Sequence, residues 1–190
     1  MKSAAFFLML AVCVTLCEAQ TVGPFNVGYR WGDRAPYGFH PGIDFIISTG
    51  TPVVAISGGR VVYFRHTSDD GDELAIVHGM HFQSNYAHLS RVFVAKDQMV
   101  RRGQLIGLSG ASNNYGRFDY QHLHFGVCKL GNGCQDEAHT HNPDLFWLGG
   151  RPQCFDPQAG YSAYSQKDIT LPLACGDYAN TLIGRSKAIQ

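Results

Sequence analysis

The most constraining stretch of this chain is Gln121-His-Leu-His-Phe-Gly-Val127, in which apolar residues alternate with histidines. Such alternation predicts a strand with one face in the core. Residues i and i+2 of a strand point to the same face, so His122 and His124 should project side by side. Two imidazoles held next to each other on a rigid strand indicate that something binds there.

Two upstream motifs could complete such a site. His40-Pro-Gly-Ile-Asp44 begins with a Pro-Gly turn and enters an apolar, β-rich segment. The spacing of His40 and Asp44 would suit one helical turn, but the Pro-Gly pair argues against a helix, and a turn into a strand also brings the two side chains together. Tyr-Ala-His88-Leu lies between this motif and the histidine strand and supplies a further imidazole.

The set His40, Asp44 and His124 would suit one Zn²⁺ ion. Imidazoles and carboxylates are typical zinc ligands, and three protein ligands leave the fourth tetrahedral position open, as in catalytic sites. Zinc lowers the pKa of a bound water to roughly 7 and polarises a carbonyl oxygen, which suits amide hydrolysis. His88 and His122 would lie beside the ion, where they could take the proton of the water and stabilise the oxyanion or the leaving amine.

The other histidines have plainer interpretations. A second pair, His139-Thr-His141, lies in a polar segment before Asn-Pro and is interpreted as two solvated loop residues. The pair His122 and His124 differs because its histidines alternate with the apolar residues Leu123 and Phe125. Three more histidines follow turns or strand ends and are assigned ordinary core or surface roles: His66, His78 and His81.

The chain as a whole predicts a mostly β, single-domain fold built on antiparallel sheets. With 45% hydrophobic and 16% charged residues over 190 positions, it can bury one core and is unlike a disordered sequence. Short β-type runs recur between Gly-rich turns, and no segment shows convincing helical periodicity. Residues 20–38 are interpreted as an irregular lead-in with at most one short strand. The runs cover 39–47, 52–56, 60–65, 73–78, 82–89, 91–95 and 102–110.

The charge balance excludes two classes of partner. Basic and acidic residues both number 15, so the formal net charge is +0, and the pI is about 7.1. A nucleic-acid binder would show a basic face and a high pI, so no nucleic-acid partner is expected. The sequence has neither a polybasic patch nor, beyond its N-terminus, an apolar segment of bilayer length, so no membrane association is expected after signal removal.

Residues 1–19 have the pattern of a secretory signal peptide. A lysine at position 2 precedes the apolar segment Ala4 to Leu16, and Cys17-Glu-Ala19 ends in a small-x-small pattern that places cleavage after Ala19. An N-terminal anchor and a lipoprotein signal are the alternatives. The lipoprotein signal is disfavoured, because Leu16 stands where a small residue should precede the lipidated cysteine. We therefore expect a secreted, extracellular protein.

Four cysteines would remain after cleavage, and an even number in a secreted chain favours two disulfides. Of the three pairings we favour Cys128–Cys134 and Cys154–Cys175, because residues 129–133 look like a hairpin turn that brings the first two together. A cysteine zinc site would need C-x-x-C spacing, which is absent. We expect a catalytic domain over 20–141 and a C-terminal extension, 142–190, packed on it and closed by the second disulfide.

The ordered motifs resemble the lysostaphin/LytM-type zinc metalloendopeptidases, mainly bacterial enzymes that cleave peptidoglycan peptides. The resemblance runs from about residue 38 to residue 127. It rests on His-x-x-x-Asp, Tyr-Ala-His-Leu-Ser, Gly-Gln-Leu-Ile-Gly-Leu-Ser-Gly and His-Leu-His-Phe in that order. The resemblance implies a β-sheet core of the duplicated hybrid motif type, with the metal in a groove between loops. It implies zinc ligands at His40, Asp44 and His124 and a catalytic pair at His88 and His122.

Two functions follow from the resemblance. The first is a secreted, monomeric zinc endopeptidase whose substrates are bacterial peptidoglycan peptides, either stem peptides or cross-bridges. The second is a non-enzymatic secreted binding protein of the same fold, like the leukocyte chemotaxin of vertebrates. A binding-only descendant need not keep His88 or His122, and both are present in matching contexts, so the enzyme is favoured. The segment 111–121 is longer than the family's usual Ser-Thr-Gly-type link, which leaves substrate choice open.

Overall fold

The computed structural model describes residues 21–68, 70–112, 120–131, 134–162 and 168–188, so the predicted signal peptide lies outside the described residues. The strands are β1 (Thr21–Val22), β2 (Phe25–Asn26), β3 (Arg34–Ala35), β4 (Gly38–Phe39), β5 (Ile43–Ile46), β6 (Pro52–Val54), β7 (Gly59–Thr67), β8 (Gly71–His78), β9 (Phe82–Val92), β10 (Met99–Val100), β11 (Leu105–Ser109), β12 (His122–Cys128) and β13 (Thr140–His141). The helices are the short 3-10 turns η1 (Pro143–Leu145) and η2 (Leu148–Gly150) and the helix α1 (Gly176–Ala188).

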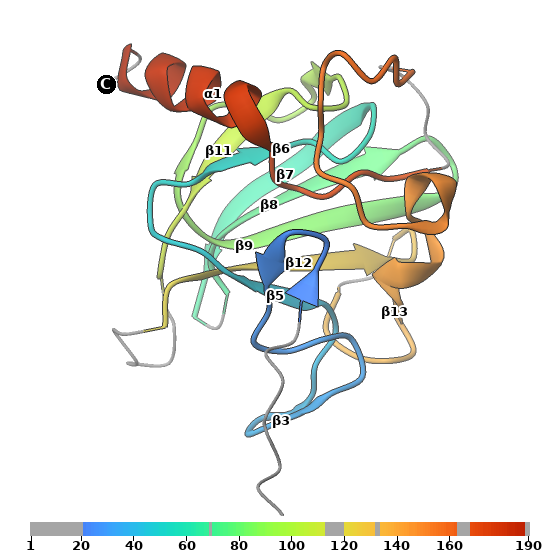
Figure 1. Ribbon diagram of the computed structural model, residues 1–190. Coiled ribbons are helices and arrows are strands. Elements are labelled where there is room, and N and C mark those ends of the chain that lie inside the picture. Colours follow the sequence, from blue (N-terminus) through green and yellow to red (C-terminus); the bar gives the residue numbers. More distant parts are fainter. Residues whose placement is uncertain (1–20, 69, 113–119, 132–133, 163–167, 189–190) are drawn as a thin grey trace, which may run out of the picture.

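Nine of these strands form one antiparallel sheet, as the sequence predicted (Figure 1). Its main path is β10-β7-β8-β9-β11-β6. Strand β9 is long enough to serve two neighbours on one side, because its first part pairs with β12 and its last part with β11. Strand β12 pairs in turn with β5 and β13. The strands β5, β12, β9, β8 and β7 therefore lie side by side in that order.

The period-2 pattern of β12 divides the sheet into a core face and a polar face. Leu123, Phe125 and Val127 are fully buried in the main hydrophobic core. The intervening positions carry the histidines and then Gly126, where a Cβ would lie 3.1 Å from the Cys134 sulfur. The alternation predicted from the sequence is thus the alternation that the strand shows.

The predicted strands differ from the structure at several places. Residues 91–95 do not form a separate strand, because β9 continues through its bulge to Val92. The lead-in contains two small hairpins, β1–β2 and β3–β4, where at most one short strand was expected.

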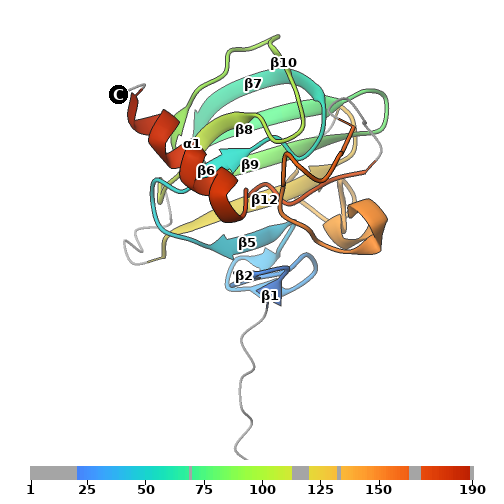
Figure 2. The same ribbon diagram turned by 45° about the horizontal axis from the view of Figure 1, so that its top comes forward.

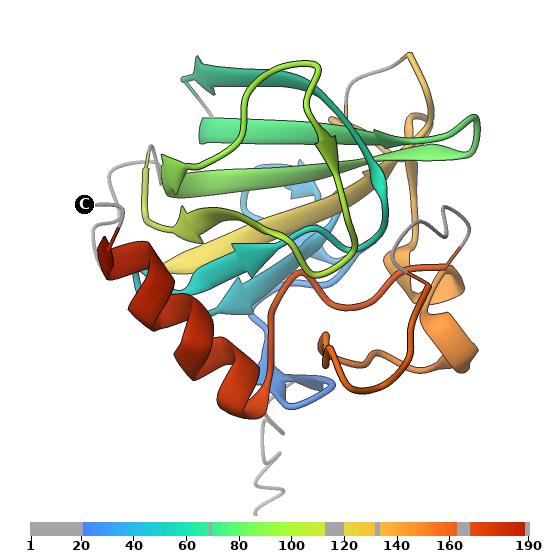
Figure 3. The same ribbon diagram turned by 90° about the horizontal axis from the view of Figure 1, so that it is seen from above.

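The C-terminal segment packs on the β6 side of the sheet and contains a helix that the sequence analysis did not anticipate. Figures 2 and 3 show α1 lying along the edge of the sheet next to β6. Leu182 of α1 packs with Val54 of β6 and Ala174. Both favoured disulfides are present, with Cα–Cα distances of 5.2 Å for Cys128–Cys134 and 5.5 Å for Cys154–Cys175.

Residues from the C-terminal segment also enter the main core. Trp147, Ile169, Leu171 and Leu173 are buried in it together with residues of the sheet. Arg102 binds the carbonyl oxygens of Ile56 and Asp168 and so ties this segment to the sheet. The domain boundary at 141/142 stays a prediction. Among the described residues, none of the helices is long and apolar enough to cross a membrane.

Candidate metal centre and active-site groove

The side chains of His40, Asp44 and His124 converge on one point. His40 Nε2 lies 3.0 Å from Asp44 Oδ1 and 3.1 Å from His124 Nδ1, and His124 Nδ1 lies 2.8 Å from Asp44 Oδ1. All three residues are buried. Within the part of the chain that the structure describes, this is the one group of three or more potential ligands close enough to share a metal ion.

The strand register explains why residues 80 positions apart meet. His124 stands directly opposite Asp44 in the β12–β5 ladder. His40 reaches the same point because the Pro-Gly turn folds the chain back just before β5. Gly42 of that turn has a packing role that the sequence analysis missed: a Cβ there would lie 2.4 Å from the Phe125 carbonyl oxygen and 2.9 Å from the His124 ring. Glycine is therefore required for the close approach of the turn to β12.

The donor set fits a zinc ion. His40 Nδ1 lies 3.0 Å from the Arg30 carbonyl oxygen, which can only accept, so Nδ1 carries the proton and Nε2 offers a lone pair. This lone pair faces the Asp44 carboxylate at 3.0 Å, and two acceptors so close repel each other unless a cation joins them. Ligands about 2.0 Å from a tetrahedral zinc ion lie about 3.3 Å apart, close to the spacing of the three atoms.

The charges in this cluster support one another. Burial alone would raise the pKa of the Asp44 carboxyl, but the hydrogen bond with His124 and the attraction of the neighbouring His124 and His122 imidazoles hold that pKa well below its usual range. Burial alone would lower the pKa of His124, but the hydrogen bond and the attraction to Asp44 raise it. Asp44 is therefore a carboxylate at neutral pH, as a metal ligand must be.

His88 occupies a strained position beside the cluster. Its φ is +60°, a region that non-glycine residues rarely adopt. The strain coincides with a bulge in β9, where the pairing with β8 jumps from Leu74–Tyr86 to Asp72–Leu89. Bulges next to active sites re-aim side chains, and this one turns His88 toward His122, with ring centroids 4.4 Å apart.

His88 and His122 are both oriented by a backbone carbonyl. His88 Nδ1 donates to the Ser112 oxygen at 2.8 Å, and His122 Nδ1 donates to the Tyr120 oxygen at 3.1 Å. In the neutral rings Nε2 is therefore the basic atom, and His122 Nε2 lies 3.7 Å from Asp44 Oδ2. Burial lowers the pKa of His88, and burial lowers that of His122 to about 4, so both rings are neutral at pH 7.

Tyr120 fixes His122 from a second side. Its ring lies against the imidazole with centroids 4.4 Å apart, and its hydroxyl fits next to Gly28, where a Cβ would lie 1.6 Å from Tyr120 Oη. Neither Tyr120 nor Gly28 was among the predicted site residues. No sequence pattern links Gly28 and Tyr120, because they are 92 positions apart and their contact exists only in the folded chain.

The cluster opens into a groove of about 710 Å³ that runs over the polar face of the sheet. Aromatic side chains line it near His40, including Tyr29 and Tyr37. Residues 113–119, in the segment expected to border the groove, lie outside the described residues. The remaining lining residues include Arg65, Asp70, Glu73, Asn85, Cys134 and Gln135.

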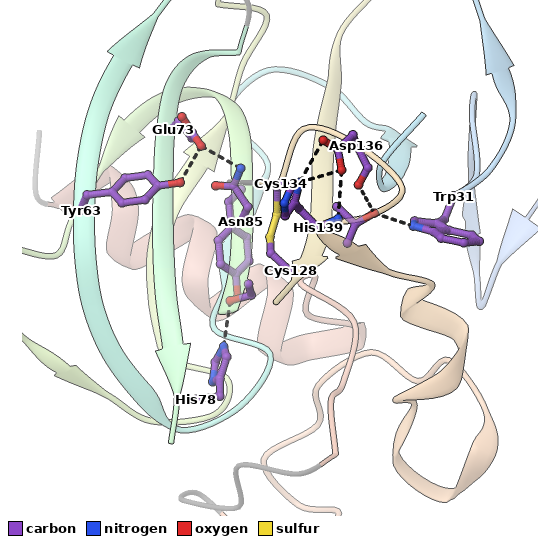
Figure 4. Close-up of a disulfide and its surroundings, with 12 residues drawn as sticks. Trp31, Tyr63, Glu73, His78, Asn85, Cys128, Cys134, Asp136 and His139 are labelled. Carbon is purple, nitrogen blue, oxygen red and sulfur yellow. Dashed lines mark hydrogen bonds and ion pairs between the residues drawn. A yellow bond between two sulfur atoms is a disulfide. The ribbon is translucent and has the colours of Figure 1, made fainter. Parts of the chain in front are cut away.

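The other histidines lie apart from the cluster. His139 is bound to Asp136 at 2.8 Å and is solvated as expected (Figure 4). His141 belongs to β13 and packs on Phe146, so the loop interpretation is wrong for His141. His78 is fully buried and bonded to the Gly58 carbonyl and to Ser84. His66 pairs with Asp72 at the surface, and His81 is exposed.

The central part of the chain is similar to known peptidases. Residues 38–137, just over half of the chain, match the family model described as peptidase family M23, and they include all five predicted site residues. The chain is 44% identical over 86 residues to the peptidoglycan DD-endopeptidase ShyA of Vibrio cholerae, a match that covers 45% of this chain and 19% of ShyA. It is 36% identical over 117 residues to lysostaphin of Staphylococcus simulans, which covers 57% of this chain and 22% of lysostaphin.

Solved structures of the same family share the fold. The catalytic domain of lysostaphin, an antimicrobial peptidase from Staphylococcus simulans, superposes with a TM-score of 0.57 at 28% identity, covering 64% of this chain and 90% of that domain. A catalytic domain variant of EnpA, a prophage-encoded M23 protein from Enterococcus faecalis, gives a TM-score of 0.54 at 29% identity, covering 66% and 94%. The chain spans only about a fifth of the length of ShyA and lysostaphin. On the family match and these likenesses, the chain belongs to peptidase family M23.

Proposed function

We propose that this protein is a secreted zinc metalloendopeptidase that hydrolyses peptide bonds of bacterial peptidoglycan. The observation that carries the proposal is the convergence of His40, Asp44 and His124 on one point, with two neutral imidazoles beside it and an open groove above it. Relatives named as a peptidoglycan DD-endopeptidase and as lysostaphin support the substrate class.

In this mechanism three residues hold the metal ion and two histidines transfer protons. His40 Nε2, Asp44 Oδ1 and His124 Nδ1 would hold the zinc ion. When bound, zinc polarises the scissile carbonyl and lowers the pKa of a water molecule. His88 Nε2 and His122 Nε2 are the free basic atoms at the site, so either can accept the proton of the attacking water. The ring that has been protonated in this way can then donate that proton from Nε2 to the developing oxyanion or to the leaving amine.

We propose that residues 1–19 direct secretion and that the mature chain acts as a monomer. The two disulfides suit an oxidising, extracellular location. The Cys128–Cys134 bridge also holds Cys134 and Gln135 against the groove.

The test combines zinc analysis with mass spectrometry of fragments released from purified peptidoglycan. The wild-type protein should contain one zinc ion per chain and release peptide fragments, whereas His122→Ala should retain zinc and release almost none. Tight binding to peptidoglycan without release of any fragment by the wild type would favour the binding-only function instead.

A further inference from the structure

The groove continues beyond the histidines to a second polar cluster on the same face of the sheet. Its floor crosses consecutive strands, from Asp44 on β5 and His124 on β12 to Asn85 on β9, Glu73 on β8 and Arg65 on β7. Three strand spacings separate β12 from β7, or about 14 Å between the strand axes. An extended peptide advances about 3.3 Å per residue, so a peptide bound across these strands would reach Arg65 within about four residues of the cleaved bond.

Arg65 is held in place by a buried carboxylate. Its Nε and Nη2 donate to Glu73 Oε2 and Oε1 at 2.8 and 3.3 Å. The Glu73 side chain is only 2% exposed and is itself fixed by Tyr63 Oη at 2.7 Å and by Asn85 Nδ2 at 2.8 Å (Figure 4). The guanidinium also lies 4.5 Å from the centre of the Tyr63 ring. A guanidinium restrained from two sides is pre-organised for binding.

Arg65 lines the groove and keeps donors that Glu73 does not use. Its side chain is 47% exposed, and Nη1 has no hydrogen-bond partner among the described residues. The planar guanidinium is the side chain best suited to pair with a carboxylate. Asp70 lines the same wall with the opposite charge, so any selectivity must come from direct contact with the guanidinium and not from the overall charge of the wall.

We propose that Arg65 forms a subsite that binds a carboxylate of the substrate peptide and thereby selects acidic peptides over their amidated counterparts. The inference rests on the proposed function, because it assumes that the groove holds a peptide. It deepens that function by naming the chemical group that the groove reads at a distance from the metal cluster.

The test uses two synthetic wall peptides that differ only in a carboxylate or a carboxamide within four residues of the cleaved bond. We expect the wild type to hydrolyse the acidic peptide with a kcat/KM about 10-fold or more above that of the amide, the scale of a charge-assisted hydrogen bond. Arg65→Gln should lower the kcat/KM for the acidic peptide to the value for its amide. Arg60→Gln is the matched control, because Arg60 lies on the same strand, pairs with Asp97 and is absent from the groove lining.

Arg65→Gln leaves Glu73 without its cation, so Arg65→Lys serves as a second variant that keeps the charge and loses the planar fork. We expect Arg65→Lys to lose most of the preference for the acidic peptide over its amide. Equal hydrolysis of both peptides by the wild type, or an equal loss for both peptides in the Arg65 variants, would overturn the subsite.

Binding of both peptides to His122→Ala separates this inference from the proposed function. If the wild type hydrolyses neither peptide but the acidic one binds more tightly in an Arg65-dependent way, the peptidase proposal fails and the subsite stands. If His122→Ala binds the two peptides equally, the subsite fails whatever the activity.

Discussion

The chain contains two H-x-H pairs, one on strand β12 and one at the start of the neighbouring strand β13, and the two pairs have different environments. His122 and His124 lie on the seven-residue strand β12, are buried and face Asp44. His139 and His141 lie at the two-residue strand β13, which pairs with the end of β12. His139 is 44% exposed and bound to a surface carboxylate, and His141 packs against an aromatic ring.

The difference shows that the flanking strands, and not the H-x-H spacing, make a candidate site. Strand β12 lies between β5, which brings Asp44, and β9, which brings His88. Among the described residues, strand β13 pairs with β12 alone, so no second strand lies beside it there to supply ligands. The apolar residues at alternate positions of β12 are the sequence signal of this central position, because only a strand with a buried face needs them.

The largest difference should appear in metal content. His124→Ala should lose zinc and measurable turnover, because it removes one of three ligands, and loss of even a partner outside the ligand set costs about 10–100-fold in affinity. His141→Ala should keep one zinc ion per chain and near wild-type turnover. Zinc analysis after dialysis against a weak chelator measures this directly. Full zinc in His124→Ala would remove His124 from the ligand set.

A second contrast separates catalysis from metal binding. His88→Ala and His122→Ala should retain zinc and lower kcat by about 10²–10⁴-fold, the range of general acid–base catalysis. His139→Ala, which also removes an imidazole next to a carboxylate, should leave kcat unchanged. Turnover of a defined peptide at matched zinc content is the measurement. Wild-type kcat in both His88→Ala and His122→Ala would contradict the assignment of the pair.

His78 tests whether burial alone gives a histidine a functional role. Its Nδ1 donates to the Gly58 carbonyl and Nε2 accepts from Ser84, so the ring is satisfied as a neutral group. Burial lowers its pKa from 6.5 to about 4. The unfolded chain therefore binds this proton between pH 6.5 and pH 4 and the folded chain does not, so stability falls as the pH falls through that window.

The loss should reach about 3 kcal/mol of unfolding free energy at pH 4. Urea unfolding of the wild type and of His78→Gln, each at pH 7 and pH 4.5, isolates the contribution of this group, because the variant lacks it. Identical pH dependence of the two proteins would show that His78 titrates normally. Zinc content should not change in His78→Gln.

Alternation and turn chemistry predicted the longer strands of the main sheet and pointed to the residues that meet at the cluster of His40, Asp44 and His124, a set that the family resemblance also implied. They could not predict the bulge at His88, because its positive φ arises from mismatched registers on the two sides of β9. Helix α1 was missed because its apolar stripe is thin: Leu182 is buried, but the next residue, Ile183, is 38% exposed. Contacts such as Gly28 with Tyr120 join distant segments and leave no local pattern.

The smallest predicted effect comes from a change to the residues that hold His122 in place, with every imidazole left intact. Gly28→Ala would place a Cβ 1.6 Å from Tyr120 Oη, so the tyrosine must move and its support of His122 weakens. We expect kcat to fall by about 10-fold, the low end of what loss of an outer partner costs, with zinc retained. Tyr120→Phe in the same chain removes the clashing oxygen and should restore part of the rate.

Gly184→Ala is the matched control for this last prediction. A Cβ at Gly184 meets no atom within 4 Å, and its helical position should gain about 1 kcal/mol of stability from alanine. If Gly28→Ala and Gly184→Ala have the same kcat, His122 keeps its orientation without the contact of the Tyr120 ring. The Tyr120 carbonyl and strand β12 would then suffice to orient the His122 ring. Only the neighbouring strands would then distinguish the two H-x-H pairs.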